Sequence, residues 1–192
     1  MRALIIAGRH TTHDEFVYPL RRLEEDGWHV DVAVRGNQMV LSDLGGKIQP
    51  TMDIPDNPTE FNIFPGTKFE KWNLLILPGG AKAMEYMRQD AFILTAISWL
   101  HSKGCTIGCI CHGAQLLISA GLVRGRKISG YYSIKDDINN AGGTYVDAPF
   151  VTDGRIVTSP HYKHLGPWMA EVLRMANLPS SLLLVPVTFD AS

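Results

Sequence analysis

Two adjacent side chains, Cys111 and His112, have the types and the setting for covalent chemistry. They follow an apolar run at residues 106–109 and precede a helix-forming segment from about residue 114 to residue 120. A strand that ends on a cysteine and continues at once as a helix turns sharply, which holds the sulfur above the edge of the sheet. The helix start favours thiolate over thiol, so the segment predicts a nucleophilic cysteine. A buried structural cysteine is the alternative, but burial alone does not explain the His-Gly pair after it.

Other residues could assist such a nucleophile. A carbonyl substrate attacked by Cys111 develops negative charge on oxygen, and the backbone N–H groups of Gly80 and His112 could hold that charge. Gly80 has no side chain to block the approach. The carboxyl group of Glu15 could hydrogen-bond the sulfur, although a carboxylate at a helix start is also explained by the helix dipole. His112 could serve as a base or as support for another group.

The elements that would position these groups alternate between strand and helix along the chain. Strands are predicted at residues 3–7, 29–34, 74–77, 106–109, 144–146 and 150–159, the last with a hairpin turn at Asp153-Gly154. Helices are predicted at residues 16–23, 92–100, 114–120, 133–141 and 164–175. This order predicts an α/β fold, a flavodoxin-like three-layer sandwich with a mainly parallel sheet and helices on both faces.

In such a sheet the functional site forms at the carboxyl ends of the strands. Three predicted loops fall there, at residues 8–15, 78–85 and 109–113. They bring a cysteine, a histidine, two glutamates and a glycine pair around one crevice. Residues 36–73 contain several Pro and Gly, which indicates a hairpin and then a long surface loop. An apolar tail at about residues 178–192 is expected to pack on the domain or on another subunit.

The composition narrows the class of protein. The chain has 192 residues, 45% of them hydrophobic and 19% charged, which is typical of one folded domain over residues 1–192 and excludes disordered and membrane-spanning classes. A net charge of −1 gives no case for nucleic acid or an anionic membrane as partner. Three cysteines make no disulfide framework and suit a reducing cytoplasm, where we expect the protein to act.

Four segments in this order resemble the ThiJ/PfpI superfamily, and more closely its PfpI intracellular-protease branch. The resemblance runs from residue 1 to about residue 175. The segments are Leu77-Pro78-Gly79-Gly80, Cys111-His112-Gly113, Gly125-Arg126-Lys127 and Ile134-Lys135-Asp136-Asp137-Ile138-Asn139-Asn140-Ala141-Gly142-Gly143.

The resemblance implies roles for two carboxylates. Glu15, in Glu-Phe-Val-Tyr-Pro, matches the glutamate that contacts the thiol in that branch. Glu85, in Glu-Tyr-Met-Arg-Gln-Asp, matches a glutamate that crosses a subunit interface and orients the histidine after the nucleophile. Cys111, His112 and a neighbour's Glu85 would then form a triad in a homodimer or larger homo-oligomer. The segment from Gly79 to Glu85 is one residue longer than in the family pattern. This insertion bears on whether Glu85 can reach His112 of a neighbouring subunit.

The resemblance also implies an activity that needs no cofactor and begins with thiolate attack on a carbonyl carbon. The substrate would be a small carbonyl compound or a peptide, through glyoxalase III-like conversion of dicarbonyls, deglycase-like repair of glycated adducts, or peptide hydrolysis. A small carbonyl or adduct is preferred, because a thiol enclosed at an interface admits a folded protein poorly. Departures at residues 159–164 and a longer loop at residues 51–70 lie near the expected pocket, so substrate choice can differ from that of other members.

Three alternatives remain open. His161 falls where the late histidine of class I glutamine amidotransferases occurs, so Cys111 and His161 could serve an amidase. The chain could instead be a non-catalytic redox sensor or chaperone whose Cys111 is trapped by oxidation. His10, His13 and Glu15 could bind a metal, although a His-x-x-His pair in a loop is weak evidence and no metal is expected.

Overall fold

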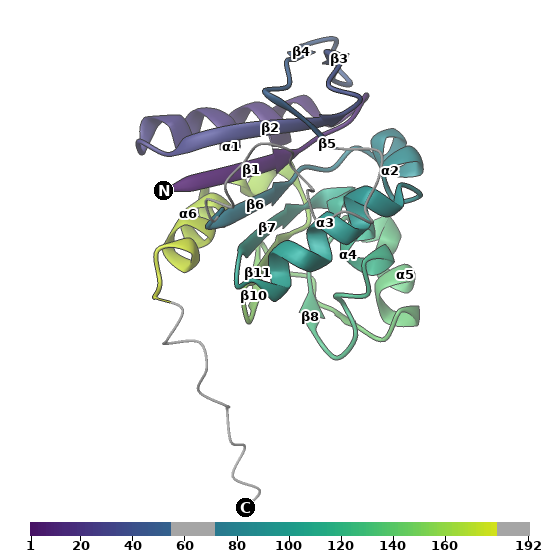
Figure 1. Ribbon diagram of the computed structural model, residues 1–192. Helices are drawn as coiled ribbons and strands as arrows, with labels where there is room; N and C mark the ends of the chain where they lie inside the picture. Colours follow the sequence, from purple (N-terminus) through teal and green to yellow (C-terminus); the bar gives the residue numbers. More distant parts are fainter. Residues whose placement is uncertain (55–71, 180–192) are drawn as a thin grey trace, which may run out of the picture.

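The computed structural model describes residues 1–54 and 72–179, and in them one large sheet carries the fold (Figure 1). Its strand order is β10-β11-β7-β6-β1-β2-β5. Neighbouring strands pair in parallel, except that β10 and β11 are antiparallel. The strands are β1 (Arg2–Ile6), β2 (His29–Arg35), β5 (Met52–Ile54), β6 (Leu74–Leu77), β7 (Thr106–Ile110), β10 (Val151–Asp153) and β11 (Ile156–Ser159).

Helices cover both faces of this sheet (Figure 1). On one face lie α1 (His13–Glu25) and α6 (Leu165–Ala176). On the other face lie α2 (Ala81–Met87), α3 (Ala91–Ser102), α4 (Ala114–Ser119) and α5 (Lys135–Asn140). The predicted three-layer α/β sandwich is therefore confirmed.

The alternation of β1 shows why these residues form a central strand. Leu4 and Ile6 pack in the apolar layer under α2, α3 and α4, whereas Ala3 and Ile5 pack in the layer under α1 and α6. Side chains of a strand point alternately to the two faces of its sheet, so a strand that is apolar at every position is buried on both. β6 follows the same rule, because all four of its side chains are buried.

Short elements complete the described chain. The β3–β4 hairpin pairs Val40–Leu41 with Lys47–Ile48, as predicted for the segment before the long loop. A second small sheet joins β8 (Lys127–Ile128) to β9 (Thr144–Tyr145). Three 3₁₀ turns are η1 (Cys111–Gly113), η2 (Tyr132–Ile134) and η3 (Tyr162–His164).

Two predictions about the chain were wrong. Residues 81–87 form the helix α2, where only a loop was expected, since the run Ala-Lys-Ala-Met-Glu after the glycine pair is rich in strong helix formers. Residues 52–54 form the edge strand β5 inside the segment expected to be a loop. The rest of that predicted loop and nearly all of the apolar tail lie at residues 55–71 and 180–192, outside the described residues.

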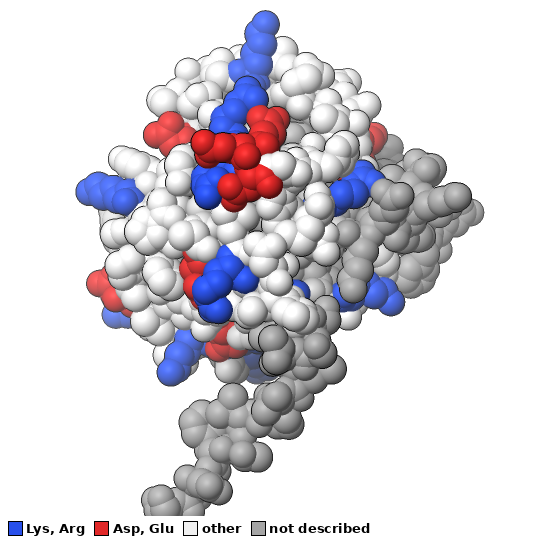
Figure 2. Space-filling model, turned by 90° about the vertical axis from the view of Figure 1, so that its left-hand side faces the viewer, with Lys and Arg blue, Asp and Glu red and all other residues white. Residues whose placement is uncertain are grey.

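Figure 2 shows the side of the molecule where the strands begin, opposite the edge that carries Cys111. On its described part, basic and acidic side chains are mixed and much of the surface is uncharged. In residues 1–54 and 72–179, no helix has the length and apolar character needed to span a membrane.

Candidate active site

Cys111 directly follows β7 and begins the turn η1 that leads into α4. Its φ is 59°, in the left-handed region that side chains other than glycine rarely adopt. The turn is held closed by Gly113, where an added Cβ would lie 2.6 Å from the carbonyl oxygen of Leu77. The predicted sharp turn is therefore present, and it leaves the cysteine 6% exposed at the edge of the sheet.

Glu15 lies in the first turn of α1 and is fully buried, although it is a carboxylic acid. Its Oε2 accepts a hydrogen bond of 2.9 Å from the N–H of Gly79. Its side chain also interacts with the Cys111 thiol. Only glycine fits at position 79, because an added Cβ would lie 2.6 Å from Oε2 and 2.8 Å from the Cβ of Cys111. Gly79 was predicted only as one of a glycine pair at the crevice, and the run Pro78-Gly79-Gly80 is the sequence signal for its role.

Two backbone N–H groups point at the sulfur of Cys111, those of His112 and Gly80. Gly80 has a φ of 111°, and an added Cβ there would lie 2.5 Å from the carbonyl oxygen of His10. Close packing of the loop after β1 against the loop after β6 thus fixes the position of the Gly80 N–H group. The two donors predicted for an oxyanion are both directed at the nucleophile.

The acid–base state of the pair differs from the sequence-based expectation. Burial, the largest effect, raises the pKa of Glu15 to about 7. Burial and then the negative charge of Glu15 raise the pKa of the Cys111 thiol above its ordinary value, while the N–H groups of His112 and Gly80 lower it. The expectation that the helix start makes Cys111 a thiolate by itself was therefore wrong, because α4 is only six residues long and burial outweighs its dipole.

The two groups titrate as a pair. When Glu15 is ionised, its charge keeps the sulfur as a thiol. When the proton resides on Glu15 instead, that charge is absent, and the carboxyl O–H and the two backbone N–H groups all favour the thiolate. One proton shared between Glu15 and Cys111 thus couples the reactivity of the sulfur to the carboxyl group.

His112 contacts the nucleophile through its ring. Nδ1 lies 3.4 Å from Sγ of Cys111, and Nε2 lies 3.4 Å from the hydroxyl oxygen of Ser133. The ring stacks on Tyr131 with centroids 4.5 Å apart. Burial lowers the pKa of His112, so the ring is neutral at pH 7 and can accept a proton. Ser133 and Tyr131 were missed from the sequence, since both contacts join segments about twenty residues apart.

Glu85 lies on the exposed side of α2. It borders a cavity of about 270 Å³ that is also lined by His112, Ser133 and Asp137. Within one chain the described residues show no hydrogen bond between Glu85 and His112. The structure thus brings Glu85 to the same cavity as the histidine, and its action across a subunit interface stays a prediction.

His161 begins the turn η3 after β11, and its Nδ1 accepts a hydrogen bond from the N–H of Lys163. Its ring lies 5.9 Å from that of Tyr131, which itself contacts His112. His161 is therefore in the neighbourhood of the site through Tyr131, and its use as a base stays a prediction.

The side chain of His13 contacts the β3–β4 hairpin. Nδ1 of His13 lies 3.1 Å from the hydroxyl of Ser42 in the β3–β4 hairpin, and Glu15 faces the thiol. In the described parts of the chain, no three His, Cys, Asp or Glu side chains are grouped so that they could hold a metal ion.

Comparisons with known proteins agree with this arrangement. The sequence profile of the DJ-1/PfpI family matches residues 1–175. The Pyrococcus horikoshii protein named deglycase PH1704 is 36% identical over 177 residues, which cover 91% of this chain and 99% of that protein. The Pyrococcus furiosus protein named deglycase PfpI is 32% identical over 176 residues, with the same coverage of 91% and 99%. DJ-1 of Schizosaccharomyces pombe superposes with a TM-score of 0.79 at 18% identity, covering 97% of this chain and all of that one, which shows a shared fold.

Proposed function

The chain belongs to the DJ-1/PfpI family, and we propose that it is a cysteine-nucleophile enzyme that converts small dicarbonyls, free or released from glycated adducts, into hydroxy acids. Relatives that bear the name deglycase and match nearly their whole length support this assignment. The observation that carries it is the surroundings of Cys111, where a buried carboxyl group and two backbone N–H groups converge on one sulfur.

The first step follows from these contacts. With the shared proton on Glu15, the thiolate of Cys111 attacks the aldehyde carbon of a dicarbonyl and forms a C–S bond. The aldehyde oxygen then takes a proton from the Glu15 carboxyl group. We assign to the N–H groups of Gly80 and His112, which are directed at the sulfur, the stabilisation of the negative charge on that oxygen before it is protonated.

The next steps need a base beside the sulfur, and we assign this role to His112. The neutral ring takes the proton from the carbon bonded to sulfur, and that proton is returned to the neighbouring carbon, while the hydroxyl proton of the first carbon passes to the oxygen of the second. The first carbon is thereby oxidised to a thioester and the second reduced to an alcohol, so no external oxidant or cofactor is needed. Water then hydrolyses the thioester, which releases the hydroxy acid and leaves one proton shared again between Glu15 and Cys111.

The burial of the nucleophile favours a small substrate. Cys111 is only 6% exposed. A dicarbonyl of a few atoms needs little room to reach this sulfur, whereas a peptide segment would need the surrounding turns to open. The glycated adducts, which are hemiaminals and hemithioacetals, release the same dicarbonyl that is also found free. The free dicarbonyl and the adducts therefore lead to the same hydroxy acid.

We further propose that the active unit is a homodimer or larger homo-oligomer in which Glu85 of one subunit orients His112 of another. The exposed position of Glu85 at the mouth of the His112 cavity supports this, because a second subunit docked there would carry its own Glu85 close to the ring.

The test is the formation of lactate from methylglyoxal by the purified protein and by Cys111→Ala. We expect lactate at a rate at least roughly a thousandfold above that of the variant, in line with the loss of a covalent nucleophile. Equal rates for the two proteins would overturn the proposal. Comparable turnover of an unfolded protein substrate at equal enzyme concentration would favour a peptidase instead.

A further inference from the structure

A second and larger cavity lies away from Cys111. It has a volume of about 590 Å³ and opens at the carboxyl ends of β1 and β2, against α2. The floor is apolar and is made by side chains of β2, α2 and α3, among them Val34, Met87 and Ile93. Because this volume falls in the range of small-molecule sites, the cavity can enclose a metabolite-sized ligand.

The position of this cavity is that of a binding site in this kind of fold. The strand order reverses direction at β1, because the chain first extends the sheet through β2 and β5 and then returns to the other side with β6. Open α/β sheets bind ligands outside the carboxyl ends of their strands at such a switch point. The loop after β1 and the helix after β6 both border the cavity, as that rule requires.

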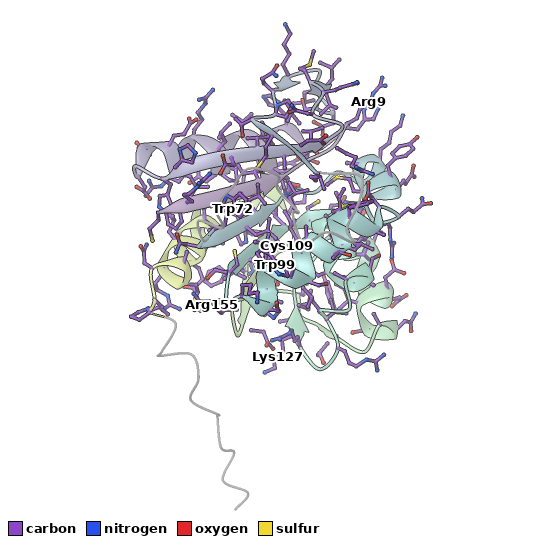
Figure 3. The ribbon with its side chains drawn as sticks, in the orientation of Figure 1. Arg9, Trp72, Trp99, Cys109, Lys127 and Arg155 are labelled. Carbon is purple, nitrogen blue, oxygen red and sulfur yellow. The ribbon has the colours of Figure 1, made fainter. Side chains whose placement is uncertain are left out.

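The rim of the cavity carries unbalanced positive charge. Arg9 and Lys82 both line it and are exposed, and neither forms a hydrogen bond or ion pair with another described residue. Figure 3 shows Arg9 at the outer edge of the molecule, beside the β3–β4 hairpin and on the same side as α2. Two cations at the mouth of an apolar cavity favour a ligand with an anionic head and an apolar body.

The acidic residue in the lining, Asp90, does not offset this charge. Its Oδ2 accepts a 2.6 Å hydrogen bond from Nε of Arg35, so these two charges pair with each other. Its Oδ1 accepts a hydrogen bond of 2.9 Å from the N–H of Phe92 and caps the start of α3. Arg35 and Asp90 thus pair within the lining, and Arg9 and Lys82 are the other Arg and Lys residues among the described residues that line the cavity.

We propose that this cavity is a binding site for a small organic anion, whose phosphate or carboxylate group lies between Arg9 and Lys82 and whose apolar part rests on Val34, Met87 and Ile93. The site is separate from the thiol, because α2 lies between the two cavities. Lys82 and Tyr86 face the anion site, whereas Glu85 and Arg88 face the cavity of His112. The proposal does not rest on the proposed catalytic function.

Calorimetric titration of the full chain with defined probes tests the site. Phenyl phosphate and benzoate each join an anionic group, phosphate or carboxylate, to a phenyl ring. Benzyl alcohol has the ring without the charge, and inorganic phosphate has the charge without the ring. We expect at least one of the two aromatic anions to bind about tenfold more tightly than both benzyl alcohol and inorganic phosphate. The anion that binds more tightly identifies the preferred head group.

Variants locate the binding. Arg9→Gln with Lys82→Gln is expected to weaken it about tenfold or more, and Lys127→Gln, an exposed lysine on β8, to change it less than about twofold. Because Arg9 and Lys82 are exposed, circular dichroism is expected to show an unchanged fold. The titration is repeated in Cys111→Ala, where unchanged affinity is expected. No saturable binding of either anion, or equal affinity in the double variant, would overturn the proposal.

Discussion

Glu15 and Gly79, which are 64 positions apart, are joined by a buried hydrogen bond of 2.9 Å from the Gly79 N–H to Oε2 of Glu15. This bond ties the first turn of α1 to the loop after β6 and holds the carboxyl group against the sulfur of Cys111. The account of the site depends on this contact, because the charge state of the carboxyl group sets that of the thiol.

Gly79→Ala is expected to damage the site more than the fold. The new Cβ would lie within 2.6 Å of Oε2 of Glu15 and 2.8 Å of the Cβ of Cys111, so both side chains must shift. We expect kcat/KM to fall about a hundredfold and stability to fall by about 1–3 kcal/mol, as for overpacked cores. Kinetics and urea unfolding measure the two effects.

Gly166→Ala is the matched control, because outside its chain neighbours and its own helix backbone the nearest atom to the added Cβ is the Tyr18 hydroxyl oxygen at 4.0 Å. Alanine there is expected to leave activity unchanged and to change stability by less than about 1 kcal/mol, since the higher helix propensity of alanine in α6 is opposed by Pro167, which disfavours a helical residue before it. If Gly79→Ala and Gly166→Ala behaved alike, the packing argument for Gly79 would be wrong.

Replacing Glu15 changes how stability depends on pH. The folded pKa of Glu15, about 7, is above its ordinary value of 4.5, so the stabilising contribution of its protonated form is complete below pH 4.5 and is lost as the pH rises through 7. Glu15→Gln mimics the protonated form at every pH. We expect the variant to match the wild type near pH 4.5 and to be more stable by roughly 3 kcal/mol at pH 8.

Urea unfolding of both proteins at the two pH values measures this difference, and other titrating groups cancel because they are common to both. If the wild type is instead more stable than Glu15→Gln at pH 8, the surrounding groups stabilise the ionised form of Glu15, and the prediction is wrong.

The sequence predicted the fold well because its signals are local. Residues 74–77 were predicted as a strand and form β6, and the turn at Asp153-Gly154 joins β10 to β11. Residues 106–109 were predicted as a strand and lie in β7, where Cys109 is fully buried. Apolar runs and turn residues specify such features without knowledge of the remainder of the chain.

The contacts inside the site were harder to predict, because they join distant segments. The bond between Gly79 and Glu15, the stacking of Tyr131 on His112 and the hydrogen bond from Ser133 all depend on how the loops pack. The pKa of Cys111 was misjudged for the same reason. A helix start can be read from the sequence, whereas burial and the nearby carboxyl group become apparent only in three dimensions.

Mixing two inactive variants tests the shared triad. If Glu85 acts across the interface, Cys111→Ala and Glu85→Gln subunits complement each other, because a hybrid dimer contains one site with an intact cysteine and a neighbour's intact glutamate. We expect Glu85→Gln alone to lower kcat/KM about tenfold or more. Refolding an equal mixture should restore about a quarter of wild-type activity, since half of the dimers are hybrids with one working site each.

If mixing instead gives about half the specific activity of Glu85→Gln alone, as simple dilution with Cys111→Ala subunits does, Glu85 acts within its own chain or not at all. Ser133→Ala is the companion variant, because Ser133 contacts Nε2 of His112 in the same chain and its loss cannot be complemented in this way.

Alkylation of the native protein should mark one cysteine of three. Burial raises the pKa of Cys105 to about 12 and that of Cys109 well above its ordinary value, and both lie in the core. We expect iodoacetamide to modify Cys111 at least about a hundredfold faster than the other two, as mass spectrometry of peptides would show. Cys105→Ala should leave the modification rate of Cys111 unchanged. Faster modification of Cys109 would contradict the position assigned to the nucleophile.

The coupling between Glu15 and Cys111 is tested by the pH dependence of Cys111 alkylation in the wild type and in Glu15→Gln. If one proton is shared between carboxyl and thiol, the wild-type rate rises through about pH 7, where Glu15 titrates, and then levels off, because the thiolate fraction no longer changes. In Glu15→Gln no negative charge opposes the thiolate, so the rate should match that of the wild type at low pH, keep rising about tenfold per pH unit above pH 7, and exceed the wild-type rate at pH 9. The same profile in both proteins would show that Glu15 does not control the nucleophile.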